Sequence, residues 1–381
     1  MNTPRRTLLR TLAWSIGLAA ASMAAAPAAF AGVDDADGLR AGMVFTSSNA
    51  AEGNEVLVYG TDAAGQLALK SHVPTAGLGS GAGLGSQGAV TLSGDGHFLF
   101  VVNAGSNTVT TFLVTPRALV RVSTVDSGGL HPISVTEYRG TVYVLNDGGS
   151  GNVAGFRNAR GVLQPIPGAS GGLSAAGGTG PAQVGFSDDG DALVVTEKAT
   201  NKLVSYAVRP DGSIGAPVVT PSPGQTPFGF AFNRRNRLVV TEAVGGAAGA
   251  STVSSYRFTQ RAPEQPVVVS RAVPDQQGAA CWVAVTPDGQ YAFVANTGSS
   301  SISSYRVDRG GSIALLAAQA GDTGAGSAPA DTAVSVNGQR LFVRNGRTAT
   351  IGAFAIGDGG SLSPLPFAAN LPATAVGLAS N

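Results

Sequence analysis

Two glutamates, Glu197 and Glu242, occupy the same place in two consecutive copies of a repeated unit. Each ends an apolar run with the length and residue types of a β-strand. Two carboxylates brought together can act as general acid and base, or can bind a cation with the help of carbonyl oxygens. Glu197 can equally pair in solvent with Lys198 or Lys202, an arrangement that adds little stability.

A histidine, His131, directly precedes Pro132 and is one of 3 histidines in the chain. Imidazole is the side chain best suited to move a proton near neutral pH, so His131 is a candidate general base. A histidine in a loop before proline also fits an ordinary surface position. We take Glu197 and His131 as the candidate catalytic residues.

Several further side chains would reach the same region from other copies of the repeat. A ligand pocket needs different groups that converge from separate segments. The tryptophan among them could stack on a ligand or pack as a plug in the channel, and the neighbouring Cys281 is expected to be a small buried hydrophobe. The candidate substrate-binding residues are Gln183, Glu242, Trp282, Asp331 and Arg344.

Composition excludes several other kinds of site. The chain has 1 cysteine, which rules out an intrachain disulfide, and its few histidines are scattered, so we expect no metal site and no cofactor. Its 24 Lys and Arg against 23 Asp and Glu give a net charge of +1 without basic clusters. We therefore expect no nucleic-acid partner.

The fold prediction rests on a repeat of about 49 residues. The recurring pattern is an apolar strand that usually follows Pro, a Ser/Thr-x-Asp-Gly turn, a second apolar strand, and an alternating strand ending in Tyr or Phe; the copies at 181–206 and 281–305 show it well. With 54 Gly and only 12% charged residues, the chain favours short strands over long helices. The second strand ends in Asn or Glu in every copy, at Asn49, Asn103, Asn146, Glu197, Glu242, Asn296 and Asn345. Seven units with room for four strands each predict an all-β protein, a seven-bladed β-propeller with one domain over residues 40–381.

The two ends of this domain are predicted to share one blade. Only one strand, at 43–46, precedes Asn49, whereas the segment 372–378 after the seventh unit resembles a spare first strand. We expect this C-terminal strand to complete the first blade and to close the ring, which removes an exposed sheet edge.

The candidate residues should share one face of the ring. In an antiparallel pair the start of the first strand lies beside the end of the second, so these side chains should surround the central channel, with a small-molecule ligand as the expected partner. The Ser/Thr-x-Asp-Gly turns should lie on the opposite face. Two glycine-rich stretches, 76–88 and 168–180, are expected to overhang the candidate face as mobile loops.

Residues 1–31 have the pattern of an export signal. The pair Arg5 and Arg6 precedes an Ala-rich apolar stretch and a small-x-small cleavage site that ends at Ala31. The adjacent arginines favour the twin-arginine type of signal, although an ordinary secretory signal fits too. We expect a monomer that is exported to the periplasm or beyond and is not held in a membrane after cleavage.

The segments 180–190 and 193–197, which read Gly-Pro-Ala-Gln-Val-Gly-Phe-Ser-Asp-Asp-Gly and Leu-Val-Val-Thr-Glu, resemble the lactonase-type seven-bladed propellers. That family includes cycloisomerase-like 6-phosphogluconolactonases and carboxymuconate lactonizing enzymes. The resemblance implies hydrolysis or formation of a lactone ring by His, Arg and Glu side chains on the channel face, without a metal in the lactonizing members. By motif, His131 matches the first histidine of the family's His-Pro-His-Ser, and Glu197 matches the acid of its Val-Val-Asn-Glu strand end.

The chain departs from the family pattern where an anionic substrate would be held. The family's Gly-Pro-Arg-His is Gly-Pro-Ala-Gln here, with Ala182 and Gln183, and the second histidine of His-Pro-His-Ser is Ile133. A sugar phosphate or muconate then lacks its usual arginine anchor. We expect an exported lactonase-like protein in which Glu197 or His131 activates water against an uncharged lactone held by Gln183 and Trp282. A non-catalytic propeller that binds a sugar, peptide or protein on the same face is the alternative.

Overall fold

A computed structural model describes Met1 and residues 42–61, 66–368 and 370–381. The predicted export signal, residues 1–31, lies outside this part of the chain except for Met1, and it stays a prediction. No described helix is long and apolar enough to cross a membrane.

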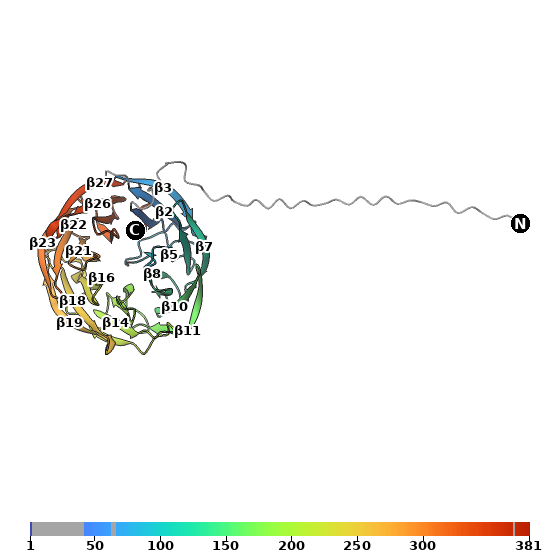
Figure 1. The fold of residues 1–381 in the computed structure, drawn as a ribbon, viewed down its shortest axis with the longest axis horizontal. Coiled ribbons are helices and arrows are strands. Elements are labelled where there is room, and N and C mark those ends of the chain that lie inside the picture. The colour runs from blue at the N-terminus through green and yellow to red at the C-terminus, as the bar shows by residue number, and fades with distance from the viewer. Residues whose placement is uncertain (2–41, 62–65, 369) are drawn as a thin grey trace.

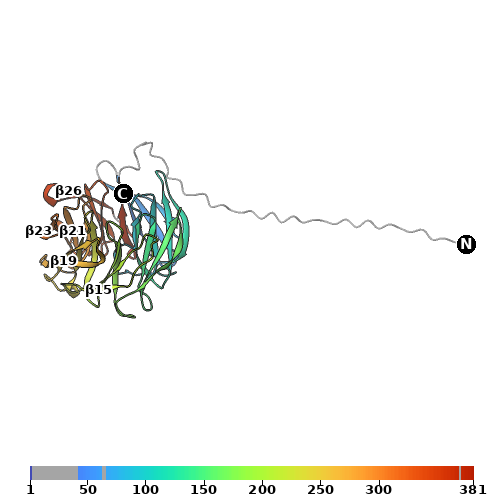
Figure 2. The ribbon, with the colours of Figure 1, turned by 60° about the horizontal axis from the view of Figure 1, so that its bottom comes forward.

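Seven four-stranded antiparallel sheets stand side by side around a central axis, as Figures 1 and 2 show. From the inner strand outward, blade 1 is β28 (Val376–Ser380), β1 (Met43–Ser47), β2 (Glu55–Thr61) and β3 (Leu67–Pro74); blade 2 is β4 (Val90–Leu92), β5 (Phe98–Asn103), β6 (Thr108–Val114) and β7 (Leu119–Asp126); blade 3 is β8 (Pro132–Tyr138), β9 (Thr141–Asn146), β10 (Asn152–Ala159) and β11 (Val162–Gly172); blade 4 is β12 (Pro181–Phe186), β13 (Ala192–Glu197), β14 (Lys202–Ala207) and β15 (Val218–Pro221).

The remaining sheets continue the same order around the ring. Blade 5 is β16 (Pro227–Asn233), β17 (Arg237–Glu242), β18 (Thr252–Thr259) and β19 (Ala262–Pro274); blade 6 is β20 (Ala280–Val285), β21 (Tyr291–Asn296), β22 (Ser301–Val307) and β23 (Ile313–Asp322); blade 7 is β24 (Pro329–Val334), β25 (Arg340–Asn345), β26 (Thr350–Ile356) and β27 (Leu362–Ala368). Two short 3-10 helices, η1 (Val244–Gly246) and η2 (Asp358–Gly360), lie in connections. The predicted seven-bladed propeller is confirmed.

The strands differ in burial according to their place in the blade. The second strands β9 and β13 are buried along their whole length, because both of their faces pack against neighbouring blades. The outer strands are mostly exposed or half-buried, as β3 and β23 are, because they lie at the rim of the blades and meet solvent. Apolar side chains between adjacent blades therefore form the core.

The predicted turns on the face away from the candidate site are present. In the turn between β12 and β13, Ser187 donates its hydroxyl to Asp189 at 2.7 Å, and Gly190 has a φ of +79°. The same bond joins Thr286 to Asp288 at 2.5 Å between β20 and β21. The short polar side chains hold the turn, and glycine supplies the left-handed backbone that it needs.

The C-terminal strand closes the ring. β28 pairs with β1, as the seventh unit's spare strand was predicted to do. The hydroxyl of Thr46 donates to the carbonyl of Gly377 at 2.7 Å, and the Met43 amide donates to the side-chain oxygen of Asn381 at 2.6 Å. Blade 1 thus takes its inner strand from one end of the domain and its other strands from the opposite end.

Deletion of residues 372–381 is expected to unfold or aggregate the protein, because it removes β28 and leaves β1 as an unpaired edge. The melting temperature and size-exclusion profile of the truncated protein measure this. A synthetic peptide with the sequence of residues 372–381 should restore part of the lost stability when it is added in excess. An unchanged melting temperature after truncation would contradict the closing role of β28.

The last part of the first glycine-rich stretch, residues 84–88, is not an overhanging loop, so the expectation was wrong for these residues. Residues 84–88 lead from blade 1 into β4 of blade 2 and bond to the inner strands of blades 3, 4 and 6. The main-chain amide of Gln87 donates to the carbonyl of Ala182 at 3.0 Å. The Gln87 side chain donates to the carbonyl of Val283 at 2.9 Å and accepts from the Val283 amide at 3.1 Å, so it continues the main-chain pairing of β20. We call residues 84–88 the channel segment.

Neighbouring residues of the channel segment are held as firmly. The hydroxyl of Ser86 donates to the carbonyl of Ile133 at 2.8 Å, and Leu84 is 8% exposed within the core. A side chain at Gly229 would meet the amide oxygen of Gln87, because a Cβ there would lie 2.2 Å from it. The channel segment therefore passes blade 5 at a position where that blade has a glycine, which leaves room for the Gln87 side chain.

The second glycine-rich stretch is also more ordered than expected. Its first residues, up to Gly172, form the end of the outer strand β11. Only the remainder, from residue 173, connects blade 3 to β12. The sequence missed this because Pro and Gly within β11 resemble a loop, and an outer strand tolerates both.

Replacing Gln87 with Ala is expected to lower the free energy of unfolding by about 2 kcal/mol, because the buried amide and carbonyl of Val283 would lose their partners. Chemical denaturation measures the loss. Gln164→Ala, in exposed β11, is the matched control and should leave the stability unchanged. Equal stability of the two variants would show that the Gln87 bridge contributes nothing.

Candidate functional site

Glu197 lies at the end of β13 and is fully buried. One carboxylate oxygen accepts from the Ser174 amide at 2.8 Å, and the other accepts from the hydroxyls of Ser174 and Thr200, both at 2.5 Å. The side chain of Lys202 reaches Ser174 at 3.5 Å rather than the carboxylate. Glu197 therefore ties the connection before β12 to the turn after β13.

Glu242 has an equivalent role at the end of β17. It is fully buried, and its oxygens accept from the hydroxyl of Ser222 and the amide of Gly224, each at 2.8 Å. The hydroxyls of Thr252 and Ser254 donate to it at 2.5 and 2.7 Å. Within the described residues neither glutamate forms an ion pair, and nearby hydroxyl and amide donors hold both carboxylates.

The asparagines at the same position explain what the glutamates do. Asn103 donates to the hydroxyl of Thr108 at 3.1 Å, and Asn296 donates to the hydroxyls of Ser301 and Ser303 at 3.2 and 2.8 Å. Both therefore anchor the turn that follows the second strand. Glutamate has a longer side chain that accepts only, so it collects hydroxyl and amide donors from farther away. The geometry favours a structural role for this position in all blades.

Gln183 and Trp282 lie in the channel wall and are engaged there. The Gln183 side chain accepts from the amide of Phe230 at 2.6 Å and donates to its carbonyl at 3.0 Å, which links blade 4 to blade 5. The indole of Trp282 donates to the carbonyl of Ser86 at 3.0 Å and packs on Phe228, with ring centroids 4.9 Å apart. Trp282 is 8% exposed, so of the two predicted roles the structure shows the packed one.

Asp331 and Arg344 form a buried pair in blade 7. The Arg344 guanidinium lies 3.4 Å from the Asp331 carboxylate, which also accepts from the Gly377 amide of β28 at 3.0 Å. Burial raises the pKa of Asp331, whereas Arg344 and the amides of Gly377 and Gly88 act in the opposite direction. The pair joins the closing strand and the channel segment to blade 7.

His131 has a different environment from the residues above. Its Nδ1 lies 2.6 Å from the carboxylate of Asp147, and its side chain is 40% exposed. The Asp147 carboxylate raises the pKa of His131 through this hydrogen bond, and burial opposes the shift. Because the carboxylate accepts the Nδ1 proton, Nε2 is the free basic nitrogen of the neutral ring. The backbone of His131 is left-handed, with a φ of +55°.

The repeat positions this backbone. The residue before the first strand is also left-handed in other blades, as at Thr226 (φ +57°) and Ala328 (φ +53°). An asparagine side chain of the preceding blade holds its amide in two of them: Asn107 accepts from His131 at 2.7 Å, and Asn201 accepts from Thr226 at 2.7 Å. The conformation is thus a feature of the fold, and only the imidazole is particular to blade 3.

Lys198 follows Glu197 and points back over the channel segment. Its ammonium donates to the carbonyl of Gly85 at 2.5 Å and lies 4.8 Å from the centroid of the Phe228 ring. No carboxylate within the described residues forms an ion pair with it. Burial lowers the pKa of Lys198, and the charge of Asp147 acts in the opposite direction. Lys198 and the His131–Asp147 pair therefore lie on the same face of the ring, and the charges of Lys198 and Asp147 attract each other.

The residues predicted from sequence do not form one cluster. The structure places His131 against Asp147, on the face that also carries Lys198. It places the other predicted residues in separate structural contacts: Glu197, Glu242, Gln183, Trp282, Asp331 and Arg344. Sequence reasoning missed Asp147, although it directly follows the strand-ending Asn146. Among the described residues, no three His, Cys, Asp or Glu side chains group closely enough to hold a metal ion.

The architecture and this face define a seven-bladed β-propeller with a polar site at the end of the channel. Residues 250–376 match the family described as "Lactonase, 7-bladed beta-propeller". The resemblance to the lactonase-type propellers is therefore confirmed, and the match covers blades 6 and 7 with part of blade 5. No curated protein matches the chain in sequence.

Solved structures show the same fold at low identity. The periplasmic gluconolactonase PpgL from Pseudomonas aeruginosa has a TM-score of 0.64 and 18% identity, over 88% of this chain and 99% of that one. A protein proposed to be a 6-phosphogluconolactonase, from Bacteroides uniformis, has a TM-score of 0.66 and 16% identity, over 88% and 98%. A functionally unknown protein from Desulfotomaculum acetoxidans has a TM-score of 0.65 and 12% identity, over 89% and 98%.

One more buried acid lies on this side of the ring. Asp275, after β19, is fully buried, and one of its oxygens has no hydrogen-bond partner. Its other oxygen accepts from the Gln277 amide at 2.8 Å. Burial raises the pKa of Asp275 to about 6. The folded protein therefore holds the Asp275 proton more tightly than the unfolded chain does.

Stability should consequently fall as the pH rises from about 4 to about 7, by up to about 3 kcal/mol from this residue alone. Stability falls because the unfolded state binds fewer protons than the folded state between these pH values. Urea denaturation at several pH values gives the free energy of unfolding of the wild type and of Asp275→Asn. The difference between the two free energies removes the contribution of the other titrating groups, which both proteins share. A difference that is constant over this range would contradict a raised pKa of Asp275.

Proposed function

We propose that the protein is a lactonase-like hydrolase that opens a small cyclic ester at the channel face, with His131 as general base. The observation that carries this proposal is the half-exposed imidazole bonded to Asp147 at 2.6 Å, on the same face as a lysine without a counter-ion. The match to the lactonase family and the similarity to a gluconolactonase from Pseudomonas aeruginosa support it.

The proposed reaction needs one proton carrier. Nε2 of His131 takes a proton from water while the water oxygen attacks the lactone carbonyl carbon. The carbonyl oxygen becomes an oxyanion in a tetrahedral intermediate. The ring C–O bond then breaks, and the departing ring oxygen takes the proton back from His131. The product is a hydroxy acid, and the histidine returns to its neutral form.

Asp147 and Lys198 have distinct supporting roles in this scheme. Asp147 keeps the proton on Nδ1 and stabilises the imidazolium that forms, as a carboxylate does for a catalytic histidine in other hydrolases. Lys198 donates one proton to Gly85 and keeps further N–H donors available for an oxyanion. Because Lys198 is partly desolvated over Phe228, its charge acts more strongly than it would in water.

Export of the protein through the signal at residues 1–31 belongs to the same proposal. The sequence of the leader supports it, and the Pseudomonas aeruginosa neighbour is described as periplasmic. The same proposal includes that the protein is a monomer and that it binds a small molecule at the channel face.

A binding protein without catalysis is the second candidate. The observation that favours it is the structural engagement of Glu197, Glu242, Gln183 and Trp282, which leaves fewer groups free for chemistry. The two candidates differ in a direct measurement, since only a hydrolase releases acid from a lactone.

Hydrolysis of D-glucono-δ-lactone and γ-butyrolactone would be followed by pH-stat titration. His131→Gln is expected to lower kcat at least about 100-fold, and Lys198→Met should also lower kcat. His97→Gln makes the same change on the opposite face and should have no effect. Glu197→Gln should act on the melting temperature rather than on kcat.

The pH profile adds a second test. kcat/KM should rise with pH as His131 loses its proton, with an apparent pKa above the ordinary 6.5. Asp147→Asn should move this rise to lower pH and lower the plateau, because the carboxylate that raises the pKa is gone. Full activity of His131→Gln would overturn the mechanism. Absence of hydrolysis, together with a lactone-dependent rise in melting temperature, would favour the binding candidate.

A further inference from the structure

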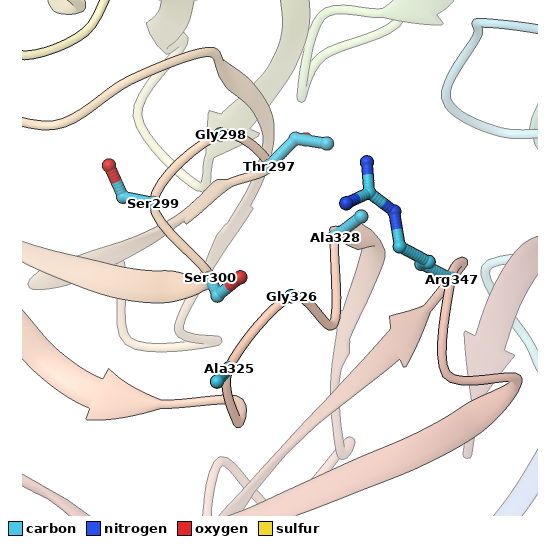
Figure 3. A pocket seen from close by; sticks show the side chains of 8 residues that line it. All are labelled: Thr297, Gly298, Ser299, Ser300, Ala325, Gly326, Ala328 and Arg347. Carbon is cyan, nitrogen blue, oxygen red and sulfur yellow. The ribbon is translucent and has the colours of Figure 1, made fainter.

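A pocket of about 340 Å³ opens between blades 6 and 7 on the face that carries Lys198. Its walls are the turn 297–300 after β21, the loop 325–328 before β24, and Arg347 in the turn after β25. Figure 3 shows these three segments around one hollow. A volume of this size accommodates a small polar molecule.

Arg347 gives the pocket an uncompensated positive charge. Its side chain is exposed, and within the described residues the guanidinium forms no ion pair and no hydrogen bond. In Figure 3 its guanidinium extends toward the side chain of Thr297 across the pocket. The other nearby arginine, Arg344, is already neutralised by Asp331. None of the lining residues is acidic.

The uncharged groups of the pocket add donors. The Ser300 hydroxyl has no partner in the described structure, and Figure 3 shows it directed toward Gly326 across the hollow. The Ser299 hydroxyl points away from Arg347 and accepts from the Gly278 amide at 2.8 Å. The lining of one pocket thus offers a guanidinium and an unpartnered hydroxyl, two kinds of donor that suit the oxygen atoms of a carboxylate or phosphate.

The pocket is connected to the face described above through Thr297. This residue lines the pocket, donates its hydroxyl to the Pro329 carbonyl at 2.8 Å, and interacts with the thiol of Cys281. The charge of Lys198 acts on the same thiol. Within the described residues Lys198 and Arg347 form no ion pair, and they lie on neighbouring parts of one face, which favours a negatively charged ligand.

We propose that this pocket binds the carboxylate or phosphate group of a small polar ligand, with Arg347 as its charged anchor and Ser300 as a hydrogen-bond donor. The chain lacks the arginine expected at Ala182, and Arg347 supplies a guanidinium at a different place on the same face. The proposal is independent of hydrolysis at His131, because the pocket residues are not part of that chemistry.

Isothermal titration of the folded protein with sodium gluconate and with glucose 6-phosphate tests the site and separates a carboxylate from a phosphate ligand. Glucose, which has the same polyol character without charge, is the ligand control. At least one of the anions should bind, and glucose should not. Arg347→Gln should raise the Kd at least about tenfold, and Arg347→Lys should restore part of the affinity. Binding should weaken as NaCl is raised.

Arg117→Gln is the matched variant, because Arg117 is an exposed arginine in a turn on the opposite face. It should leave the Kd unchanged. All variants are expected to melt at the wild-type temperature, since both arginines are exposed. Equal Kd values for the wild type and Arg347→Gln would overturn the proposal. So would the absence of binding of both anions up to about 10 mM.

Discussion

The hydrogen bonds that cross the channel are the constraint on which the rest of the structure depends. Seven sheets around an axis contact each other mainly through their flat faces, and these contacts leave the inner edges of the sheets unpaired. In this protein two glutamine side chains satisfy part of those edges. Gln87 bonds to Val283 on the far side of the ring, and Gln183 bonds to Phe230 in the next blade. Each side chain acts as a peptide group, with one donor and one acceptor.

This constraint also decides where a ligand can bind. The channel segment bonds to blades 3, 4 and 6, so it takes part of the space in the channel that a ligand would otherwise enter. Polar groups that remain accessible lie on the face above it, where Lys198 is fixed by the carbonyl of Gly85. Buried carboxylates and amides serve the blades themselves, whereas the half-exposed His131 and the exposed Arg347 keep atoms free for other molecules.

Much of the fold could be predicted from the sequence because its signals are local. The Ser/Thr-x-Asp-Gly turn recurs in blades 2, 4 and 6, and an Asn or Glu ends the second strand of every blade. The turn is fixed by bonds within a few residues, as at Ser187 and Asp189. The direction of a side chain at a blade edge depends instead on partners far away in sequence. Glu197 was therefore interpreted as accessible, although Ser174 and Thr200 enclose it.

The contacts of the channel segment are even harder to predict from local sequence. Its glycines favour a flexible loop when each residue is considered alone, and nothing near Gln87 indicates that its partner is Val283, 196 positions away. The pairing of His131 with Asp147 spans only 16 positions, yet it too depends on the left-handed backbone before β8. Blade geometry, which the repeat predicts, is needed before such contacts can be inferred.

The closing strand has a consequence for biosynthesis. Of the strands of the propeller, a ribosome makes β1 first and β28 last, so blade 1 has only three of its strands until β28 has been made. The six other blades can fold as they emerge, since each is continuous in the chain. Blade 1 must wait with the edge of β1 open, and during this interval the nascent chain is most exposed to pairing with a second copy of itself.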